Sequence, residues 1–315
     1  MSDALLQVEH LEVVYPGRGG APFTAVRDLG FSMAAGESFG VVGESGSGKS
    51  TIGRVILGLE PRYRGQVRWD GRDLATLNAA QRRALTRDIQ VVFQDPNGSL
   101  NPARTIGQTL QEPLRVHGMG AAEIERRVAE VLVQVGLTPQ DAQRYPRSFS
   151  GGQRQRIAIA RALAIKPRLI VCDEPVSALD LSIQAQILNL LQQIRRETGV
   201  AYLFISHDLA VVRHMTQRLM VLYRGTVLET GDTERIYQAP AHPYTQRLLA
   251  AMPVPGGHAV PLPPEPAGGS LPPNPVGCVY QHRCAQARPE CARVEPERRV
   301  SAAGIEVVCH LQAQS

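Results

Sequence analysis

One octapeptide limits what this chain can fold into. Residues 43–50 read Gly-Glu-Ser-Gly-Ser-Gly-Lys-Ser; they follow the short apolar run 37–42 and open a helical pattern over residues 50–59. A strand that enters a helix through such a loop directs several backbone N–H groups and the helix N-terminus toward one anion. The segment therefore predicts a phosphate-binding loop in an α/β domain.

The residue types in this loop predict which side chain binds phosphate and which binds the metal ion. Lys49 is expected to reach the β- and γ-phosphates, and the Ser50 hydroxyl to bind Mg²⁺. Of the 34 Lys and Arg residues, only Lys49 and Lys166 are lysine, which supports a compact ammonium being kept for phosphate. The predicted nucleotide-binding residues are Gly43, Glu44, Ser45, Gly46, Ser47, Gly48, Lys49, Ser50 and Thr51.

Composition narrows the class of protein. The 315 residues carry a net charge of +5, but arginines are interspersed with acidic residues rather than massed in one segment. This pattern favours an ordinary soluble surface over a nucleic-acid-binding one. No apolar run is long enough to span a bilayer, and the first residues lack a secretion signal. We therefore expect a cytosolic protein.

The order of apolar patterns predicts an α/β fold. Strand-like runs occupy residues 5–15, 23–33, 37–42, 66–69, 89–93, 169–172, 201–205, 218–223 and 226–229. The strand–helix–strand order over residues 169–205 predicts a mostly parallel sheet covered by helices. Residues 105–163 read as helical, and one face of a helix is formed by Ile124, Val128, Val131, Leu132 and Val135.

Carboxylates follow the strand at residues 169–172. Asp173 is predicted to hold Mg²⁺, and Glu174 to polarise the water that attacks the γ-phosphate. Three single residues extend this site: Gln94 as a contact of Mg²⁺ or the water, His207 as a γ-phosphate contact, and Tyr15 as a stacking partner of adenine. Each has an ordinary structural explanation alone, and only the combination favours these roles.

A second anion-binding pattern, Ser150-Gly-Gly-Gln153, begins another helix. Together with the phosphate loop, Gln94, Asp173-Glu174, the stretch 177–180 and His207, it resembles an ATP-binding-cassette (ABC) ATPase over roughly residues 5–250. The resemblance implies a P-loop NTPase cassette: a RecA-like core, an antiparallel β subdomain and a helical subdomain inserted at about residues 100–165. Phe149 and Cys172 depart from residues common in the family, outside the expected chemistry.

The resemblance also explains why one chain has two anion-binding patterns. In this family two ATPase domains meet head to tail. Ser150, Gly151, Gly152 and Gln153 would then contact the γ-phosphate held by the partner's loop, and Asp180 would belong to the D-loop. Such a helix N-terminus gains a charged ligand when ATP bridges the two domains.

Four stretches indicate the subfamily. Residues 93–102, 172–180, 241–245 and the tail from residue 277 resemble oligopeptide/dipeptide importer ATPases, and Val-Ser-Ala-Leu-Asp180 resembles the second of two non-identical ATPases. This implies ATP-driven peptide import with Mg²⁺, a non-identical ATPase partner, two membrane permease subunits and an external binding protein. It also implies no nucleic-acid partner and a peripheral position on the cytoplasmic side of the inner or plasma membrane.

Other functions fit these features less well or equally well. Related importers carry nickel or sugars, and their ATPases would look alike. A soluble ABC ATPase acting on nucleic acid would have a long coiled-coil insert or two cassettes, whereas this chain has a short insert and one phosphate loop. A phosphoryl-transfer kinase leaves Ser150-Gly-Gly-Gln153 unexplained, and an exporter half would normally be fused to membrane helices.

The C-terminal part has a different composition. Residues 1–252 are predicted to form the ATPase domain and residues 253–275, with nine prolines and four glycines, an extended linker. The extension at residues 276–315 holds four of the five cysteines: Cys278, Cys284, Cys291 and Cys309.

The clustered cysteines suggest a metal. A reducing cytosol disfavours disulfides, and four thiolates suit zinc or a 4Fe–4S cluster equally, with His282 and His310 as alternative zinc ligands. The resemblance favours the 4Fe–4S cluster. Because the extension offers almost no apolar core, a metal was expected to hold its shape and to help dock it on the partner ATPase.

Overall fold

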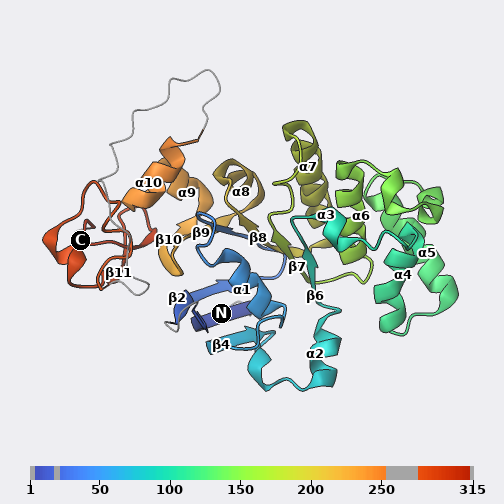
Figure 1. Cartoon of the computed structure of the whole chain (residues 1–315), viewed down its shortest axis with the longest axis horizontal. Coiled ribbons are helices and arrows are strands. Elements are labelled where there is room, and N and C mark those ends of the chain that lie inside the picture. Colours follow the sequence, from blue (N-terminus) through green and yellow to red (C-terminus); the bar gives the residue numbers. More distant parts are fainter. Residues whose placement is uncertain (1–3, 18–21, 253–275, 313–315) are drawn as a thin grey trace. The chain divides into compact units, whose positions relative to one another are not determined.

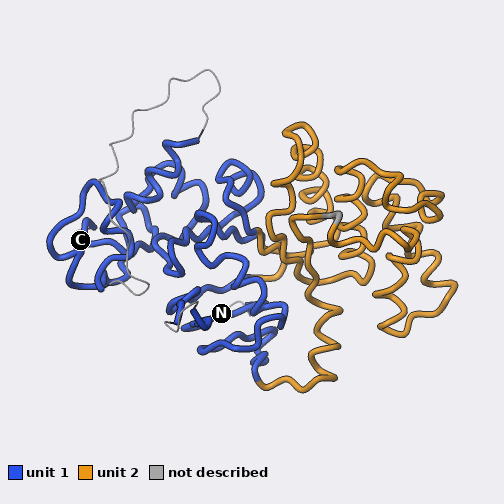
Figure 2. Tube along the Cα trace, viewed as in Figure 1, with its two compact units in different colours: residues 1–33, 38–75, 205–315 blue, residues 34–37, 76–204 orange. Residues whose placement is uncertain are grey.

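The computed structural model describes residues 4–17, 22–252 and 276–312, and the chain forms two compact units. Figure 2 colours the first unit, residues 1–33, 38–75 and 205–315, apart from the second, residues 34–37 and 76–204. The first unit thus combines the N-terminal strands and the phosphate loop with the C-terminal part of the chain. The predicted linker at residues 253–275 lies outside the described residues.

An antiparallel sheet belongs to the first unit. Its order is β2 (Phe23–Met33), β1 (Leu6–Tyr15), β4 (Arg64–Trp69) and β5 (Arg72–Asp73). Strand β1 buries alternate side chains until a register shift between Val8 and Leu11, where His10 has a φ of 51°. The turn Asp70-Gly71 joins β4 to β5, as the sequence predicted.

A second sheet contributes five neighbouring strands to the same unit. Their order is β11 (Arg298–Val300), β12 (Glu306–Val308), β10 (Thr226–Asp232), β9 (Arg218–Tyr223) and β3 (Ser38–Val42). The pair β3–β9 is parallel and the other three pairs are antiparallel, so this part of the sheet is mixed rather than mostly parallel. Hairpin connections cause the difference, because a short turn can join only antiparallel strands.

Helices complete the first unit. They are α1 (Lys49–Ile56), α8 (Leu209–Met215), α9 (Thr233–Gln238), α10 (Pro243–Ala250) and the 3₁₀ turn η4 (Pro289–Ala292). Helix α1 ends three residues before the predicted end, and Gly58, at a φ of 70°, follows it. Figure 1 shows α9, α10 and the C-terminal segment, in orange and red, beside strand β10. The helices α9 and α10 and the strands β11 and β12 were not predicted.

The second unit holds three neighbouring strands and most of the helices. The strands are β8 (Ala201–Ser206), whose last two residues belong to the first unit, β7 (Leu169–Asp173) and β6 (Ile89–Val92), and β6 runs parallel to β7. The helices are α2 (Ala79–Leu85), α3 (Pro96–Ser99), α4 (Ile106–Val116), α5 (Ala121–Gln134), α6 (Gly151–Leu163) and α7 (Leu181–Thr198). Three 3₁₀ turns are η1 (Leu74–Thr76), which crosses the boundary between the units, η2 (Pro139–Gln143) and η3 (Pro146–Ser148).

Burial follows the predicted patterns. All six residues of β8 are buried, as expected for a strand covered on both faces. The predicted apolar face of α5 is buried, from Ile124 to Val135. Helix α7 ends at Gly199, which adopts the left-handed conformation with a φ of 69°.

The C-terminal segment has more apolar packing than its composition suggested. Tyr280, Ile305 and Val307 are buried, and Val307 and Cys309 pack with Ala241 and Leu311. Strand β12 also pairs with β10, where Glu229 lies opposite Val307. The expectation that the extension lacks a core was therefore wrong, because the segment shares the core of the first unit.

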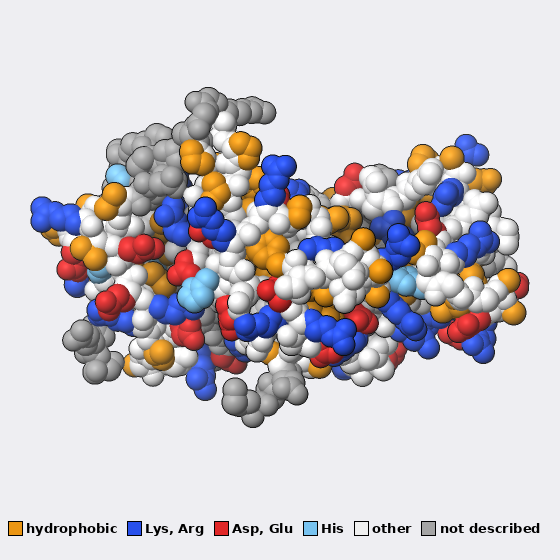
Figure 3. Space-filling view, turned by 90° about the horizontal axis from the view of Figure 1, so that it is seen from below, with side chains coloured by type: hydrophobic (Ala, Val, Ile, Leu, Met, Phe, Trp, Pro, Cys, Tyr) orange, Lys and Arg blue, Asp and Glu red, His pale blue; other side chains and the backbone are white. Residues whose placement is uncertain are grey.

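Charges of both signs cover the surface. On the face in Figure 3, Lys and Arg side chains are interspersed with Asp and Glu among the described residues. Among the described helices, we find none that combines the length and the apolar character needed to cross a bilayer.

Candidate functional site

The phosphate loop connects β3 to α1 and needs its glycines. A Cβ on Gly43 would lie 2.1 Å from the carbonyl oxygen of Leu222, and one on Gly48 would lie 2.2 Å from that of Ala25. Gly48 also has a φ of 103°, which side chains rarely allow. Strand β9 and the start of β2 therefore pack closely against the loop and fix its path.

Lys49 folds back over this loop. Its ammonium donates to the carbonyl oxygens of Gly43, at 2.7 Å, and Glu44, at 2.8 Å, and the residue is buried. The hydroxyl of Ser47 is also buried and has no hydrogen-bond partner among the described residues. A cation and an orphaned hydroxyl within one glycine loop suit an oxyanion such as phosphate.

Tyr15 lies close to the start of α1. Burial raises the pKa of its phenol, and Thr51 and Glu60 lie near enough to the hydroxyl to affect that pKa. The ring is half-buried at the end of β1, opposite Phe23. Tyr15 thus lies close to Thr51, one of the predicted nucleotide-binding residues.

His207 follows β8 and belongs to the first unit. The side chain is exposed, and the cap of helix α8 is made by the next residue, whose carboxylate accepts from the N–H groups of Ala210 and Val211. Asp208, and not His207, therefore caps helix α8.

Gln94 and the two carboxylates share an edge of the second unit's strands. Strands β6 and β7 are parallel and pair Val92 with Cys172, so the chain leaves both strands at the same edge. Gln94 follows β6, Asp173 ends β7, and Glu174 comes next. The structure thus brings together three predicted residues whose oxygens suit Mg²⁺ and water.

Glu174 has a strained backbone. Its φ is 50°, in the left-handed region that non-glycine residues seldom occupy. The turn is held by Ser177, whose N–H and hydroxyl both donate to the Glu174 carbonyl oxygen, at 3.3 and 3.1 Å. Strain of this kind concentrates at functional sites, at a cost of about 1–3 kcal/mol.

Ser150 caps the second predicted anion site. Its hydroxyl accepts from the Gln153 N–H at 3.3 Å, and the Gln153 side-chain oxygen accepts from the Ser150 N–H at 3.0 Å. This capping box begins α6 and leaves Gly151 exposed and Gly152 buried.

The neighbours of this helix are explained by packing. Phe149 is buried, and the guanidinium of Arg144 lies 4.3 Å from its ring centroid. Cys172 is fully buried in β7, and burial raises the pKa of its thiol. Asp180 is exposed at the N-cap of α7 and makes no side-chain cap hydrogen bond. Phe149 and Cys172, the two departures from the family pattern, are therefore core residues.

The four C-terminal cysteines are buried as free thiols. Burial raises the pKa of Cys278 to about 11, and the charges of Cys291, Cys309 and Cys284 contribute. Burial likewise raises the pKa values of Cys284 and Cys309. The thiols thus lie close enough to interact, yet within the described ranges no three His, Cys, Asp or Glu side chains are arranged to hold a metal ion.

The two histidines proposed as alternative zinc ligands differ in their surroundings. His282 is exposed, whereas the Nε2 atom of His310 lies 2.9 Å from the carbonyl oxygen of Val294. His310 is therefore engaged with the backbone of the same segment.

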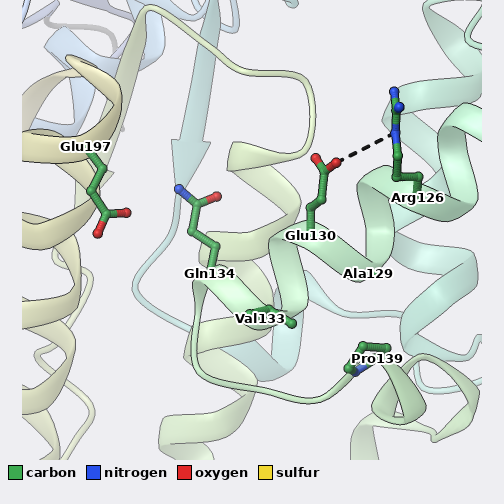
Figure 4. A pocket seen from close by; sticks show the side chains of 7 residues that line it. All are labelled: Arg126, Ala129, Glu130, Val133, Gln134, Pro139 and Glu197. Carbon is green, nitrogen blue, oxygen red and sulfur yellow. Dashed lines mark ion pairs between the residues drawn. The ribbon is translucent and has the colours of Figure 1, made fainter.

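A hollow in the second unit is separate from these motifs. It has a volume of about 640 Å³ and is lined by Arg126, Ala129, Glu130, Val133, Gln134, Pro139 and Glu197. Figure 4 shows the ion pair of Arg126 and Glu130 on α5 at its side. None of the lining residues is one of the predicted nucleotide contacts.

Sequence reasoning gave no role to two buried polar residues next to α10. Glu229 is fully buried on β10 and accepts from the N–H groups of Ala241, at 2.7 Å, and His242, at 3.2 Å. His242 caps α10 by accepting from the Tyr244 N–H. The stretch 241–245 was noticed only as a family resemblance; its His-Pro pair before a helix is a capping signal.

Comparison with known proteins shows the family to which this chain belongs. Residues 26–177 match the family described as ABC transporter, and residues 228–291 match the one described as oligopeptide/dipeptide transporter, C-terminal region. The oligopeptide transport ATP-binding protein OppF of Escherichia coli is 48% identical over 86% of this chain and 83% of its own length. This chain belongs to the oligopeptide/dipeptide family of ABC transporter ATPases. The family prediction is confirmed.

Other relatives of this ABC ATPase agree. The OppF protein of Haemophilus influenzae is 44% identical over 93% of both chains, and AppF of Bacillus subtilis is 43% identical over 98% of both. Among solved structures, CbiO1 of Clostridium perfringens, part of an ABC transporter complex, is 25% identical with a TM-score of 0.68, covering 75% of this chain and 92% of its own. The predicted cassette fold and ATPase class are confirmed.

A second solved structure shows such a cassette with its products. The ATP-binding cassette MJ0796, a dimer in a post-hydrolysis state bound to ADP and Pi, is 31% identical with a TM-score of 0.65. The match covers 72% of this ABC ATPase and 98% of that chain. That dimer is a property of MJ0796 and informs the proposal below.

Proposed function

We propose that this ABC ATPase powers the import of oligopeptides and dipeptides through a membrane transporter. The observation that carries the proposal is the match of residues 228–291 to the C-terminal region of such transporters, together with relatives named for oligopeptide transport at 43–48% identity. The ATPase works peripherally, on the cytoplasmic side of the inner or plasma membrane. Two permease subunits form the path, and an external binding protein delivers the peptide.

The experiment is transport in reconstituted vesicles. The chain is combined with its two permease subunits and a second ATPase, and uptake of labelled peptide is measured with and without ATP. ATP-dependent uptake that disappears with Lys49→Ala supports the proposal, since Lys49 lies in the phosphate loop. ATP-dependent uptake of nickel without peptide uptake would instead show an importer of another substrate.

Each predicted site residue has a proposed role. On the first unit, residues 43–51 hold the phosphates, Tyr15 stacks on adenine and His207 contacts the γ-phosphate. Ser50 on the first unit, and Asp173 and Gln94 on the second unit, are each proposed as ligands of Mg²⁺. Mg²⁺ supplies charge neutralisation at the phosphates, and Glu174 accepts the proton of the attacking water.

The Ser150-Gly-Gly-Gln153 helix serves a partner. Its N-terminus is exposed at Ser150 and Gly151, and the Ser150 hydroxyl is already oriented by the capping box. We infer that ATP joins two ATPase domains head to tail and that the partner is a non-identical ATPase. Asp180, exposed at the start of α7, lies in the D-loop of the same interface.

We also propose a 4Fe–4S cluster at Cys278, Cys284, Cys291 and Cys309, with zinc as the alternative. The donor chemistry fits, because the four cysteines are buried free thiols of one segment, and a metal that binds thiolates would displace their protons to solvent. The chain would then consist of the cassette at residues 1–252, a linker at residues 253–275 and a Cys-rich extension at residues 276–315.

The cluster is tested by anaerobic purification, a visible spectrum and metal analysis. Iron with inorganic sulfide and a brown colour supports the cluster. A colourless protein with one zinc per chain supports the alternative, and a protein without either metal contradicts both.

A further inference from the structure

Glu44, the second residue of the phosphate loop, is bound by the C-terminal segment. The Nη1 atom of Arg283 lies 3.0 Å from one carboxylate oxygen of Glu44 and 2.8 Å from the other. The two residues are 239 positions apart and belong to the same compact unit. Both side chains are only partly exposed, at 31% for Arg283 and 41% for Glu44.

The backbone of Glu44 is held as well. Its N–H donates to the hydroxyl of Tyr244 at 3.1 Å, and its carbonyl oxygen accepts from the Lys49 ammonium at 2.8 Å. Glu44 therefore connects Lys49 of the phosphate loop to Tyr244 and Arg283. A shift of the Glu44 carboxylate would be transmitted to the carbonyl oxygen that holds Lys49.

A rigid aromatic cluster supports both contacts. The ring centroid of Tyr244 lies 4.8 Å from that of Tyr223 and 5.2 Å from that of Tyr280, and all three residues are buried. The guanidinium of Arg283 lies 5.8 Å from the Tyr223 ring centroid. Tilted and edge-to-face aromatic rings of this kind favour fixed geometry. Arg283 is thus placed by packing rather than by its charge alone.

A short turn between two buried cysteines carries Arg283. The Arg283 N–H donates to the Tyr280 carbonyl oxygen at 3.0 Å, and the Cys278 N–H donates to that of Cys291 at 2.8 Å. Cys284 follows Arg283 directly and is buried. The fold of this segment therefore determines where the guanidinium lies.

The charges explain why such a contact is needed. A carboxylate on a loop that binds phosphate has the same sign as its ligand and would repel it. The Arg283 guanidinium contacts both carboxylate oxygens with one nitrogen and neutralises this charge. We propose that Arg283 is a positioning residue that prepares the phosphate loop for nucleotide by neutralising and holding Glu44.

This inference rests on the nucleotide site proposed for residues 43–51. It is tested with the full chain by measuring the Kd for a fluorescent, non-hydrolysable ATP analogue with Mg²⁺. Arg283→Met removes the charge and keeps much of the length of the side chain. We expect the Kd to rise by about two- to fivefold, the range for losing one partly exposed ion pair.

A double-mutant cycle separates charge from simple loss of structure. Glu44→Gln removes the carboxylate that would repel the phosphate, so adding Arg283→Met to this variant should change its Kd by less than about twofold. Glu44→Gln combined with Arg283→Met should return the Kd to within about twofold of wild type. The defect of Arg283→Met alone should also shrink at high salt, because screening weakens the repulsion.

The matched control is Arg298→Met. Arg298 lies in the same C-terminal segment and pairs with Glu306 at 3.3 Å, on strands β11 and β12. This variant should leave the Kd unchanged, and the melting temperature of every variant is recorded. An equal loss of affinity in Arg298→Met would attribute the effect to the stability of the segment and overturn the proposal.

The outcomes distinguish this inference from the nucleotide site itself. If wild type fails to bind the analogue, or Lys49→Ala binds it as tightly as wild type, the proposed site is wrong. If Lys49→Ala loses binding while Arg283→Met binds like wild type, the site stands and the role of Arg283 is refuted. A double variant as weak as Arg283→Met alone refutes it equally.

Discussion

Glu174 combines an unfavourable backbone conformation with a carboxylate at a strand end. A residue with a φ of 50° would usually be glycine or asparagine, yet here the Ser177 N–H and hydroxyl hold the turn through the Glu174 carbonyl oxygen. The strain therefore comes with a defined direction for the side chain. This supports a catalytic rather than a structural reason for a glutamate at this position.

Glu174→Gln should keep nucleotide binding and lose hydrolysis. The amide has nearly the same shape and tolerates the same backbone, but it cannot accept a proton from water. A general base contributes about 10²- to 10⁴-fold, so ATP turnover should fall by at least about a hundredfold. The measurement is phosphate release beside the Kd for the ATP analogue. Turnover at the wild-type rate would remove Glu174 from the role of base.

Helix α6 begins with two glycines that have different neighbours. A Cβ on Gly152 would lie 2.6 Å from the Cγ2 atom of Ile183 on α7, whereas one on Gly151 would lie 3.7 Å from Leu179. Gly152 is thus required by the packing of α6 against α7. The same glycine that marks the anion-binding pattern in the sequence has a structural reason within its own unit.

Gly152→Ala should therefore destabilise the second unit by about 1–3 kcal/mol, the usual cost of overpacking. Gly151→Ala is the matched control and should change the free energy of unfolding by less than about 1 kcal/mol, since its Cβ finds an ordinary contact. Adding Ile183→Ala to Gly152→Ala should recover part of the loss. Urea denaturation measures all of these variants, and equal effects of the two glycine substitutions would contradict the packing argument.

Helix α10 is capped by a histidine that must stay neutral. Burial lowers the pKa of His242 from its ordinary 6.5 to about 3, and the ring accepts a hydrogen bond from the Tyr244 N–H. The ring of Tyr280, from the C-terminal segment, lies 5.7 Å away. Glu229 accepts from the His242 N–H, and burial raises the pKa of that carboxyl.

The sign of the pH effect follows from these shifts. Between pH 6.5 and about 3 the unfolded chain protonates His242 while the folded protein does not. The free energy of unfolding should therefore fall as the pH drops through this range, by about 1.4 kcal/mol per pH unit. His242→Asn keeps a side-chain acceptor and should lose this slope.

The measurement is urea denaturation of both proteins at several pH values from neutral to mildly acidic. The raised pKa of Glu229 acts with the opposite sign, because the folded state favours its protonated form. That contribution is present in wild type and His242→Asn alike, so the difference between the two isolates His242. Identical slopes would show that His242 becomes protonated in the folded protein.

At the scale of the whole molecule, one chain holds halves of two ATP sites. The phosphate loop and the Ser150 helix belong to different compact units, and the proposed dimer uses each against its counterpart on another chain. Hydrolysis should then depend on association even though each unit is folded.

Specific ATPase activity should therefore fall on dilution and recover when the partner ATPase is added. Ser150→Ala in this chain should abolish hydrolysis at the partner's loop and leave the Kd of this chain for nucleotide unchanged. Phosphate release over a dilution series measures the first effect. Full activity of an isolated monomer would show that the site is complete within one chain.

The sequence alone determined the parts of this protein whose function depends on local spacing. The phosphate loop, the carboxylates after Cys172 and the start of helix α6 are contiguous patterns, and each requires a fixed neighbourhood of a few residues. Strands and helices of clear periodicity were found for the same reason.

Only the tertiary structure decided the contacts between distant segments. The ion pair of Arg283 with Glu44, the approach of Ile183 to Gly152 and the burial of His242 join residues that no local pattern connects. The C-terminal segment likewise has little apolar sequence of its own and finds its core on strand β10. The physical reason is that burial and charge pairing depend on which surfaces meet, and local periodicity reports only which face of an element is apolar.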